Sequence, residues 1–330
     1  MPLIQTIDLV KEYTVTEKAA GVRAAVSSLF RPRRKTIVAV DRINLSIERG
    51  ETVAYLGPNG AGKSTTIKML CGILHPSSGE VLVDGLSPWR DRQVLAGRIG
   101  VVFGQRTQLY WDLRLGESFE LLRRIYQIPA EAYRANHAWL EETLGLRDII
   151  DSPVRTLSLG QRMRGEVAAA LLHNPDILFL DEPTIGLDVE AKQRIREFIL
   201  ELNRVRNTTV LLTTHDLDDV EKLCQRLVII NHGIVVEDGP LGQMMERLAP
   251  CRVMEVEHEA ALLRLDIPGV EVTKEEGHRT WLRFERNQIS APALIQALSS
   301  RMAIRELRVH EPKIEDILKE IYQRPAAKTG

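Results

Sequence analysis

The chain has 330 residues, 44% of them hydrophobic and 27% charged, with 44 Lys and Arg against 45 Asp and Glu. This composition excludes a disordered or fibrous chain, and the near-zero net charge excludes a global attraction to nucleic acid or to an anionic membrane. Three widely spaced cysteines argue against a disulfide framework or a zinc site and favour a reducing cytosol. The sequence shows no basic and apolar leader and no apolar run near the ~18 residues of a membrane span, so we expect no crossing of a membrane by this chain alone.

Short apolar runs alternate with helix-length patterns between residues 37 and 238, which predicts a doubly wound α/β domain with a parallel sheet. The expected buried strands are Thr52–Leu56, Ile99–Phe103, Ile177–Leu180, Val210–Leu212 and Leu227–Ile230. The expected helices, rich in Leu, Ala, Glu and Arg, are Glu117–Gln127, Glu131–Leu144, Gln161–Leu172 and Val189–Val205. Two of these helices and no strand fall within residues 106–157, so this segment is predicted to be a helical insertion.

Residues 16–36 form a basic insertion with six basic residues and one acidic residue. Its apolar residues Val22, Val26, Leu29 and Phe30 share one face of a helix. Two interpretations stay open: a basic amphipathic segment at a membrane surface, or a solvated loop.

After residue 250 the pattern changes to strand, helix, strand, strand, helix, strand, which predicts a small ferredoxin-like α+β domain. We therefore expect one domain over residues 1–245 and a second over 246–330. The second contains no catalytic constellation, so regulation or dimer support is its expected role. The expected elements are Arg252–Glu257, Glu259–Leu265, Val270–Lys274, Thr280–Phe284, Ala291–Ser299 and Ile304–His310, followed by an amphipathic helix at Lys313–Tyr322.

A phosphate-binding loop is predicted at residues 57–64, which read Gly-Pro-Asn-Gly-Ala-Gly-Lys-Ser between an expected strand and an expected helix. Glycines let successive backbone N–H groups and a helix N-terminus face one phosphate chain. Lys63 is expected to reach the β- and γ-phosphates, and the Ser64 hydroxyl is expected to hold Mg²⁺.

Three further polar residues end buried strands at the edge that should face this loop. Asp181 and Glu182 follow the run Ile177–Leu180, and His215 follows Val210–Leu212. In this context Asp181 is a candidate Mg²⁺ ligand and Glu182 a candidate general base. His215 by itself is more typical of a surface or capping residue, and His232 follows another expected strand in a similar position.

Taken together and in this order, several motifs resemble the nucleotide-binding subunit of ABC transporters over about residues 4–242: Gly57–Ser64, Leu157-Ser158-Leu159-Gly160-Gln161, Asp181-Glu182-Pro183-Thr184, Gly186-Leu187-Asp188 and His215. The resemblance implies a P-loop NTPase cassette with a RecA-like parallel core, an antiparallel N-terminal β subdomain and a helical subdomain at about 106–157. It also implies an ATPase that binds ATP and Mg²⁺.

The same resemblance assigns roles residue by residue. Lys63, Glu182 and His215 are the implied catalytic residues, and Ser64, Gln105 and Asp181 the implied Mg²⁺ ligands. Gln105 lies one residue later than the family spacing, which leaves Gln108 as the alternative. The implied nucleotide-binding residues are Tyr13, Gly57, Pro58, Asn59, Gly60, Ala61, Gly62, Lys63, Ser64, Thr65 and Gln105, with Ser158, Gly160 and Gln161 closing on the ATP of a second chain.

Two of these assignments carry alternatives or departures. Tyr13 stands where the family places an aromatic ring that stacks on adenine, although a half-buried tyrosine of an edge strand would give the same sequence. In the signature motif, Leu159 replaces the usual first glycine, while Gly160 is kept.

Within the family, the basic insertion, the Leu-Ser-Leu-Gly-Gln signature and the stretches Gln108–Leu113 and Glu311–Leu318 look most like ATP-binding proteins of bacterial ABC-2-type exporters. This implies a separate ABC-2-type permease, a second cassette as dimer partner, a position on the inner face of the cell membrane, and no nucleic acid. Tyr110 and Trp111 are candidate anchors for the permease or packing residues of the helical subdomain. The main alternative is a soluble ABC ATPase acting on a partner such as the ribosome; a DNA-repair ATPase and a sugar-importer cassette fit less well.

Overall fold

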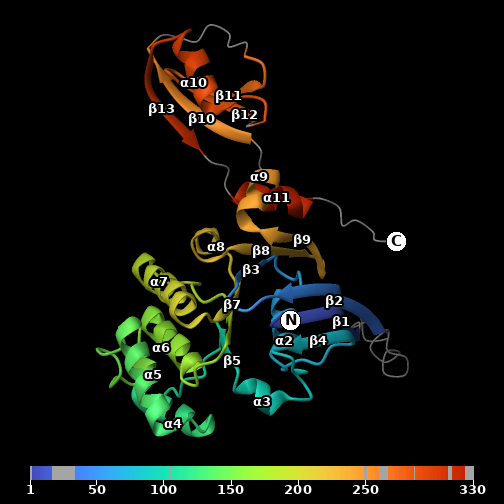
Figure 1. Cartoon of the computed structure of the whole chain (residues 1–330), viewed down its shortest axis with the longest axis vertical. Coiled ribbons are helices and arrows are strands. Elements are labelled where there is room, and N and C mark those ends of the chain that lie inside the picture. The colour runs from blue at the N-terminus through green and yellow to red at the C-terminus, as the bar shows by residue number, and fades with distance from the viewer. Residues whose placement is uncertain are drawn as a thin grey trace, which may run out of the picture. The chain divides into compact units, whose positions relative to one another are not determined.

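The computed structural model describes residues 2–16, 34–104, 106–248, 251–259, 267–285, 287–310 and 314–323. The chain divides into two compact units, residues 1–239 and 240–329, which are described separately (Figure 1). Gln105, most of the basic insertion and most of the expected helix Glu259–Leu265 lie outside the described residues.

A six-stranded sheet forms the centre of the first unit, in the order β5-β6-β7-β3-β8-β9. The pairs from β5 to β8 are parallel, as expected. Helices cover a parallel sheet on both faces, which explains why the central strands are continuous apolar runs. The strands are β3 (Thr52–Leu56), β5 (Ile99–Phe103), β6 (Ile177–Asp181), β7 (Thr209–Thr213), β8 (Arg226–Asn231) and β9 (Ile234–Pro240).

A second, antiparallel sheet lies beside it in the order β2-β1-β4, with β1 at Ile4–Thr16, β2 at Arg34–Ile47 and β4 at Ser78–Val83. The helix α2 (Lys63–Leu70) shares one core with both sheets, because Ile67, Ile43 and Tyr55 belong to the same buried cluster. The short helix α3 (Arg92–Ala96) packs at the edge of this cluster through Leu95. The antiparallel N-terminal subdomain implied by the resemblance is therefore confirmed.

The remaining helices of this unit gather on the other side of the parallel sheet (Figure 1). Residues 106–157 hold two α-helices and a short 3-10 helix, and the helix that follows them begins at the signature motif. Helix starts differ from the predicted ones by at most two residues. The helices are α4 (Leu115–Ile125), α5 (Ala130–Thr143), η1 (Val154–Thr156), α6 (Leu159–Leu171), α7 (Val189–Arg206) and α8 (Leu217–Leu223).

The second unit contains a four-stranded antiparallel sheet in the order β11-β12-β10-β13. This order, with α10 between β12 and β13, is that of a ferredoxin-like domain. Met254, Phe284 and Leu294 lie in its buried core. The elements are α9 (Leu241–Leu248), β10 (Cys251–His258), β11 (Val270–Glu276), β12 (Arg279–Glu285), α10 (Ala291–Ser299), β13 (Ile304–His310) and α11 (Ile314–Gln323). The expected boundary between residues 245 and 246 falls inside α9.

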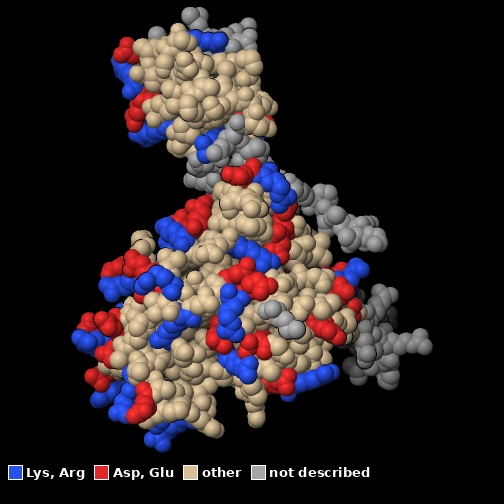
Figure 2. Space-filling view, viewed as in Figure 1, with Lys and Arg blue, Asp and Glu red and all other residues tan. Residues whose placement is uncertain are grey.

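Two general properties bear on function. Among the described helices, none combines the length and the apolar character that a membrane span requires. On the face shown in Figure 2, acidic and basic side chains are intermixed rather than gathered by sign. The surface shown therefore agrees with the balanced charge of the sequence.

Candidate active site

The phosphate loop lies between β3 and α2, as its sequence predicts. Gly62 precedes α2 with φ at 104° and ψ at 0°, a left-handed conformation that favours glycine. A Cβ at Gly62 would also lie 2.4 Å from the carbonyl oxygen of Ala39. The loop therefore needs glycine here for both its backbone conformation and its packing against β2.

Lys63 is buried inside the loop. Its Nζ donates to the carbonyl oxygens of Gly57, at 2.5 Å, and Pro58, at 3.2 Å. Burial lowers the pKa of Lys63, and the neighbouring carboxylates of Glu182 and Asp181 oppose this shift. The ammonium group is thus held between the loop and the two acidic residues, where a phosphate would add a further negative charge.

Asp181 ends β6 and meets two hydroxyl groups. Its Oδ1 accepts from Thr213 Oγ1 at 2.6 Å and from Ser64 Oγ at 3.4 Å. Hydroxyl and carboxylate oxygens are the donors that Mg²⁺ prefers. Ser64, Asp181 and Glu182 line one cleft together with Phe103, Gly104 and Arg106.

Glu182 stands in an uncommon backbone conformation, with φ at +57°. Left-handed conformations at residues other than glycine cost free energy and cluster at functional sites. The strand neighbours hold it, since the Glu182 N–H donates to the Thr213 carbonyl at 2.9 Å. This conformation places Glu182 Oε1 2.8 Å from Nε2 of His215, a side chain that remains 49% exposed. The two predicted catalytic side chains therefore form a pair.

A buried ionic network holds the loops that carry this pair. Asp219, fully buried on α8, accepts from Arg196 Nε at 2.5 Å. Its other oxygen accepts from the hydroxyls of Thr184, at 2.5 Å, and Thr214, at 3.0 Å. Thr184 follows Glu182 by two residues and Thr214 directly precedes His215, so one carboxylate fixes both loops.

The signature residues line a second cleft, which shares no residue with the first. Ser158 and Gln161 form a capping box at the start of α6: the Gln161 N–H donates to Ser158 Oγ at 3.2 Å and the Ser158 N–H to Gln161 Oε1 at 2.9 Å. Gly160 has a packing role, because a Cβ there would lie 2.8 Å from Ala191 Cβ on α7. Within one chain the structure does not bring these residues to the phosphate loop.

The two remaining predicted nucleotide contacts have different outcomes. Tyr13 is 38% exposed and pairs with Ile37 across the antiparallel sheet. Ala39, two residues after Ile37, lies against Gly62, so Tyr13 belongs to the strand pair that packs on the phosphate loop. Gln105 lies outside the described residues. Its alternative, Gln108, donates its side-chain amide to the carbonyl of Glu166 at 3.0 Å and so belongs to the helical subdomain.

Several residues of the site were not found by sequence reasoning. Thr213, Asp219 and Arg196 carry no motif of their own, although Thr213 stands at the carboxyl end of a buried strand as Asp181 does. The position at a strand end was the available signal for Thr213. Asp219 and Arg196 lie on helices whose pairing only the fold reveals.

The fold and the phosphate loop define a P-loop nucleoside triphosphatase. A model of the ABC transporter family matches residues 40–185. The ABC transporter ATP-binding protein NatA of Bacillus subtilis (strain 168) is 36% identical over 220 residues, which cover 67% of this chain and 89% of that protein. The Nod factor export ATP-binding protein I of Ralstonia nicotianae is 33% identical over 292 residues, covering 87% of this chain and 90% of that protein.

A solved structure gives the same result. The dimeric, post-hydrolysis structure of the ATP-binding cassette MJ0796 bound to ADP and Pi superimposes with a TM-score of 0.60 at 27% identity, covering 72% of this chain and 98% of that one. The chain belongs to the ABC transporter family, as one of its ATP-binding proteins, and it is an ATPase.

Proposed function

We propose that the chain is the ATP-hydrolysing subunit of an ABC-2-type exporter, placed on the inner face of the cell membrane by a separate permease. The observation that carries the catalytic part is the Glu182–His215 pair, 2.8 Å apart, beside the cleft of Ser64 and Asp181. The export part rests on the match to a relative named for Nod factor export over 87% of this chain. The two relatives described above are named for transport and export, which favours the transport proposal over the soluble alternative.

The residues of the first cleft divide the work of phosphoryl transfer. The backbone N–H groups that follow Pro58 in the loop Gly57–Thr65, together with the Lys63 ammonium, would bind the phosphates. Ser64 and Asp181, with Gln105, would hold Mg²⁺, which supplies charge neutralisation at the phosphate oxygens when bound. Glu182 would accept a proton from the attacking water, and His215, within hydrogen-bond distance of Glu182, would donate to the γ-phosphate. Tyr13 would stack on the adenine ring.

A second chain completes the site in this proposal. Ser158, Gly160 and Gln161 line a cleft of their own, so they reach a nucleotide only on another cassette. The solved cassette MJ0796, to which this chain is similar, is dimeric. We therefore propose a head-to-tail dimer, of identical chains or of this chain and a paralogue, that ATP closes and hydrolysis opens.

The docking surface for the permease is proposed on the helical subdomain. Tyr110 and Trp111 keep 43% and 50% of their surfaces exposed. Exposed aromatic rings are enriched at the centres of protein interfaces. This exposure favours the anchoring role over the packing role for both rings.

Purification from native membranes tests the proposal. The tagged chain and its Glu182→Gln variant are isolated after gentle solubilisation of membranes, with Mg–ATP present. We expect one or two multi-span membrane proteins to co-purify with both, and their recovery to fall when Tyr110 and Trp111 are both replaced by serine. Recovery of ribosomes or DNA-bound complexes in place of membrane proteins would contradict the transport proposal and leave the ATPase chemistry standing.

A further inference from the structure

Glu166 is a buried carboxylate on α6 that the ATPase chemistry does not use. It is 5% exposed and forms no ion pair in the part of the chain that the structure describes. Neutral groups hold it: the hydroxyl of Thr107 donates to Oε1, and the N–H of Gln108 donates to Oε2 at 3.1 Å. Burial raises the pKa of Glu166 despite these hydrogen bonds. The charge of Arg162, on the same helix, opposes the effect of burial but does not outweigh it. A buried carboxylate that makes no ion pair costs folding free energy, which points to a role other than stability.

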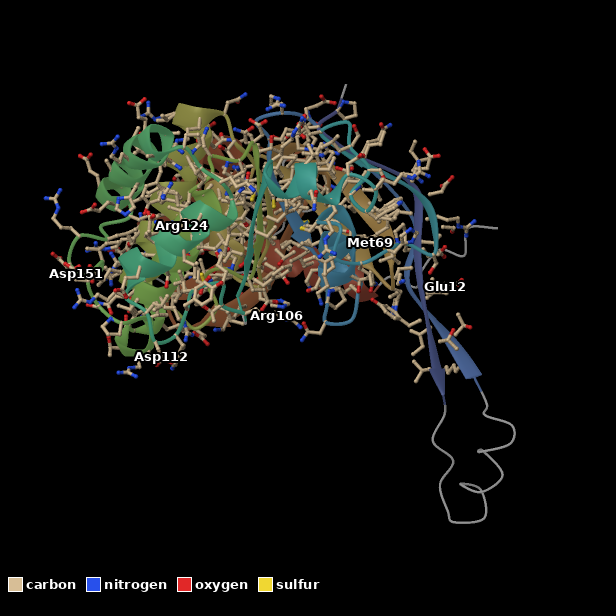
Figure 3. All side chains as sticks on the ribbon, turned by 90° about the horizontal axis from the view of Figure 1, so that it is seen from below. Glu12, Met69, Arg106, Asp112, Arg124 and Asp151 are labelled. Carbon is tan, nitrogen blue, oxygen red and sulfur yellow. The ribbon has the colours of Figure 1, made fainter. Side chains whose placement is uncertain are left out.

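Both partners of Glu166 belong to the 107–113 segment, which leads from β5 to α4. Arg106, the residue before it, lines the cleft of Ser64 and Asp181. Figure 3 labels Arg106 between the two halves of the unit and Asp112 among the helices of the helical subdomain. The 107–113 segment therefore connects the nucleotide cleft with the surface that presents Tyr110 and Trp111.

The signature helix α6 contacts this segment along one face. The guanidinium carbon of Arg162 lies 5.7 Å from the centre of the Trp111 ring. Gly165 leaves space for Leu115 of α4 and Leu109 of the segment, since a Cβ there would lie 2.9 Å from Leu115 Cδ1 and 3.2 Å from Leu109 Cδ1. Positions 162, 165 and 166 are spaced three and four apart, so they fall on the same side of the helix.

Glu166 is the only charged residue among the buried residues of α6. It follows Ser158 by eight residues, or about 12 Å along a helix that rises 1.5 Å per residue. Its carboxylate and its carbonyl together receive three hydrogen bonds from Thr107 and Gln108. If the signature end of α6 moves, these three hydrogen bonds to Glu166 would carry the movement to the 107–113 segment.

We propose that Glu166 is a positioning residue that fixes the 107–113 segment to α6, so that contact between the signature and ATP on a second chain reaches the surface of Tyr110 and Trp111. This inference rests on the proposed function. It concerns transmission within the chain, since Glu166 touches neither nucleotide cleft.

Hydrogen–deuterium exchange of the whole protein tests the inference directly, because the Gln108 N–H donates to Glu166 itself. All variants carry Glu182→Gln so that Mg–ATP is bound without turnover. In this parent we expect Mg–ATP to slow exchange both at the start of α6 and in the 107–113 segment. Adding Glu166→Ala should keep the slowing at α6 and abolish it in the segment, where exchange becomes about tenfold faster.

Two further variants separate transmission from simple structural support. Glu166→Gln keeps an acceptor for the Gln108 N–H and should restore the ATP response of the segment. Thr107→Val removes the hydroxyl that donates to Glu166 and that also accepts from the Leu109 N–H, so its exchange is compared with and without Mg–ATP in the same variant. It tests the same link if Glu166→Ala does not fold, and it should reduce the ATP response of the segment. Glu120→Gln, a surface carboxylate of α4, is the matched control and should behave as the parent.

The inference is overturned if the 107–113 segment keeps its full response to Mg–ATP in Glu166→Ala or, where that variant does not fold, in Thr107→Val. If Mg–ATP slows exchange nowhere in the Glu182→Gln parent, the proposed function itself fails, and the inference fails with it. The response of the Glu182→Gln parent to Mg–ATP therefore distinguishes failure of the proposed function from failure of this inference.

Discussion

The buried Asp219 gives the sharpest prediction about how the fold supports the catalytic pair. Asp219→Asn keeps the shape of the side chain and removes its charge. The amide oxygen can still face Arg196 Nε, and the amide nitrogen can donate to the hydroxyls of Thr184 and Thr214. What is lost is the charge of a fully buried acceptor opposite the buried Arg196.

The size of this loss follows from those contacts. Hydrogen bonds to charged groups contribute about 1.5–3 kcal/mol, and Arg196 keeps a second carboxylate, Asp216, at 3.3 Å. We therefore expect Asp219→Asn to lower the free energy of unfolding by about 2 kcal/mol. Because the two threonines flank Glu182 and His215, we also expect kcat to fall about tenfold, equivalent to about 1.4 kcal/mol, at little change in KM for ATP.

Urea unfolding followed by tryptophan fluorescence, with steady-state phosphate release, measures both quantities. The matched control is Asp218→Asn, because Asp218 is the adjacent residue, has a 66% exposed side chain and approaches Arg196 only to 4.0 Å. This control should change stability by less than about 0.5 kcal/mol. Equal stability and equal kcat for the two variants would refute the role assigned to the network.

Three other changes have defined outcomes. Lys63→Ala should weaken ATP binding in calorimetric titration by about tenfold or more, and an unchanged affinity would count against the phosphate loop. Gly160→Ala should lower stability by about 1 kcal/mol, because the new Cβ crowds Ala191 and the gain in helix propensity offsets only part of that strain; Ala191→Gly in the same chain should restore it, and the idea fails if it does not. The raised pKa of Glu166 means that the folded chain binds more protons there than the unfolded chain, so its stabilising effect is full below the ordinary pKa of 4.5 and is lost as pH rises through the folded pKa. The urea midpoint of Glu166→Gln should therefore increase relative to that of the parent as pH rises. A difference in midpoint that does not change with pH would contradict the raised pKa of Glu166.

Much of the fold could be predicted because buried parallel strands are short apolar runs with clear ends. The strands Thr52–Leu56 and Ile99–Phe103 have the predicted bounds, as does the helix Ala291–Ser299, whose Ser290 cap and proline in the first turn mark its start. Two helices begin two residues earlier than predicted, at Leu115 and Leu159. At Leu159 a capping box of Ser158 and Gln161 draws the preceding residues into the first turn, and at Leu115 the Glu117 carboxylate accepts from the Arg114 N–H.

The candidate site was predictable where a motif fixes the chemistry and unpredictable where tertiary contacts do. Lys63, Ser64 and Asp181 meet as expected because the loop and β6 end at the same edge of the sheet. The left-handed conformation of Glu182 depends on its hydrogen bond to Thr213, a residue 31 positions away. The burial of Glu166 also depends on tertiary contacts. A glutamate in a helical sequence is expected at the surface, and only the packing of α6 against the 107–113 segment shows that this one is buried.

Phosphate release by the purified chain and by its Glu182→Gln variant, with ATP binding measured on the same samples, tests the central claim most directly. We predict that the variant binds Mg–ATP like the parent and accumulates as a dimer. Its rate of phosphate release should be lower than the parental rate by a factor of at least about 100, since a positioned general base contributes about 10²–10⁴ in rate. The surface variant Glu197→Gln should keep the parental rate. Hydrolysis by Glu182→Gln at the parental rate would contradict the assignment of Glu182 as the base and, with it, the site described above.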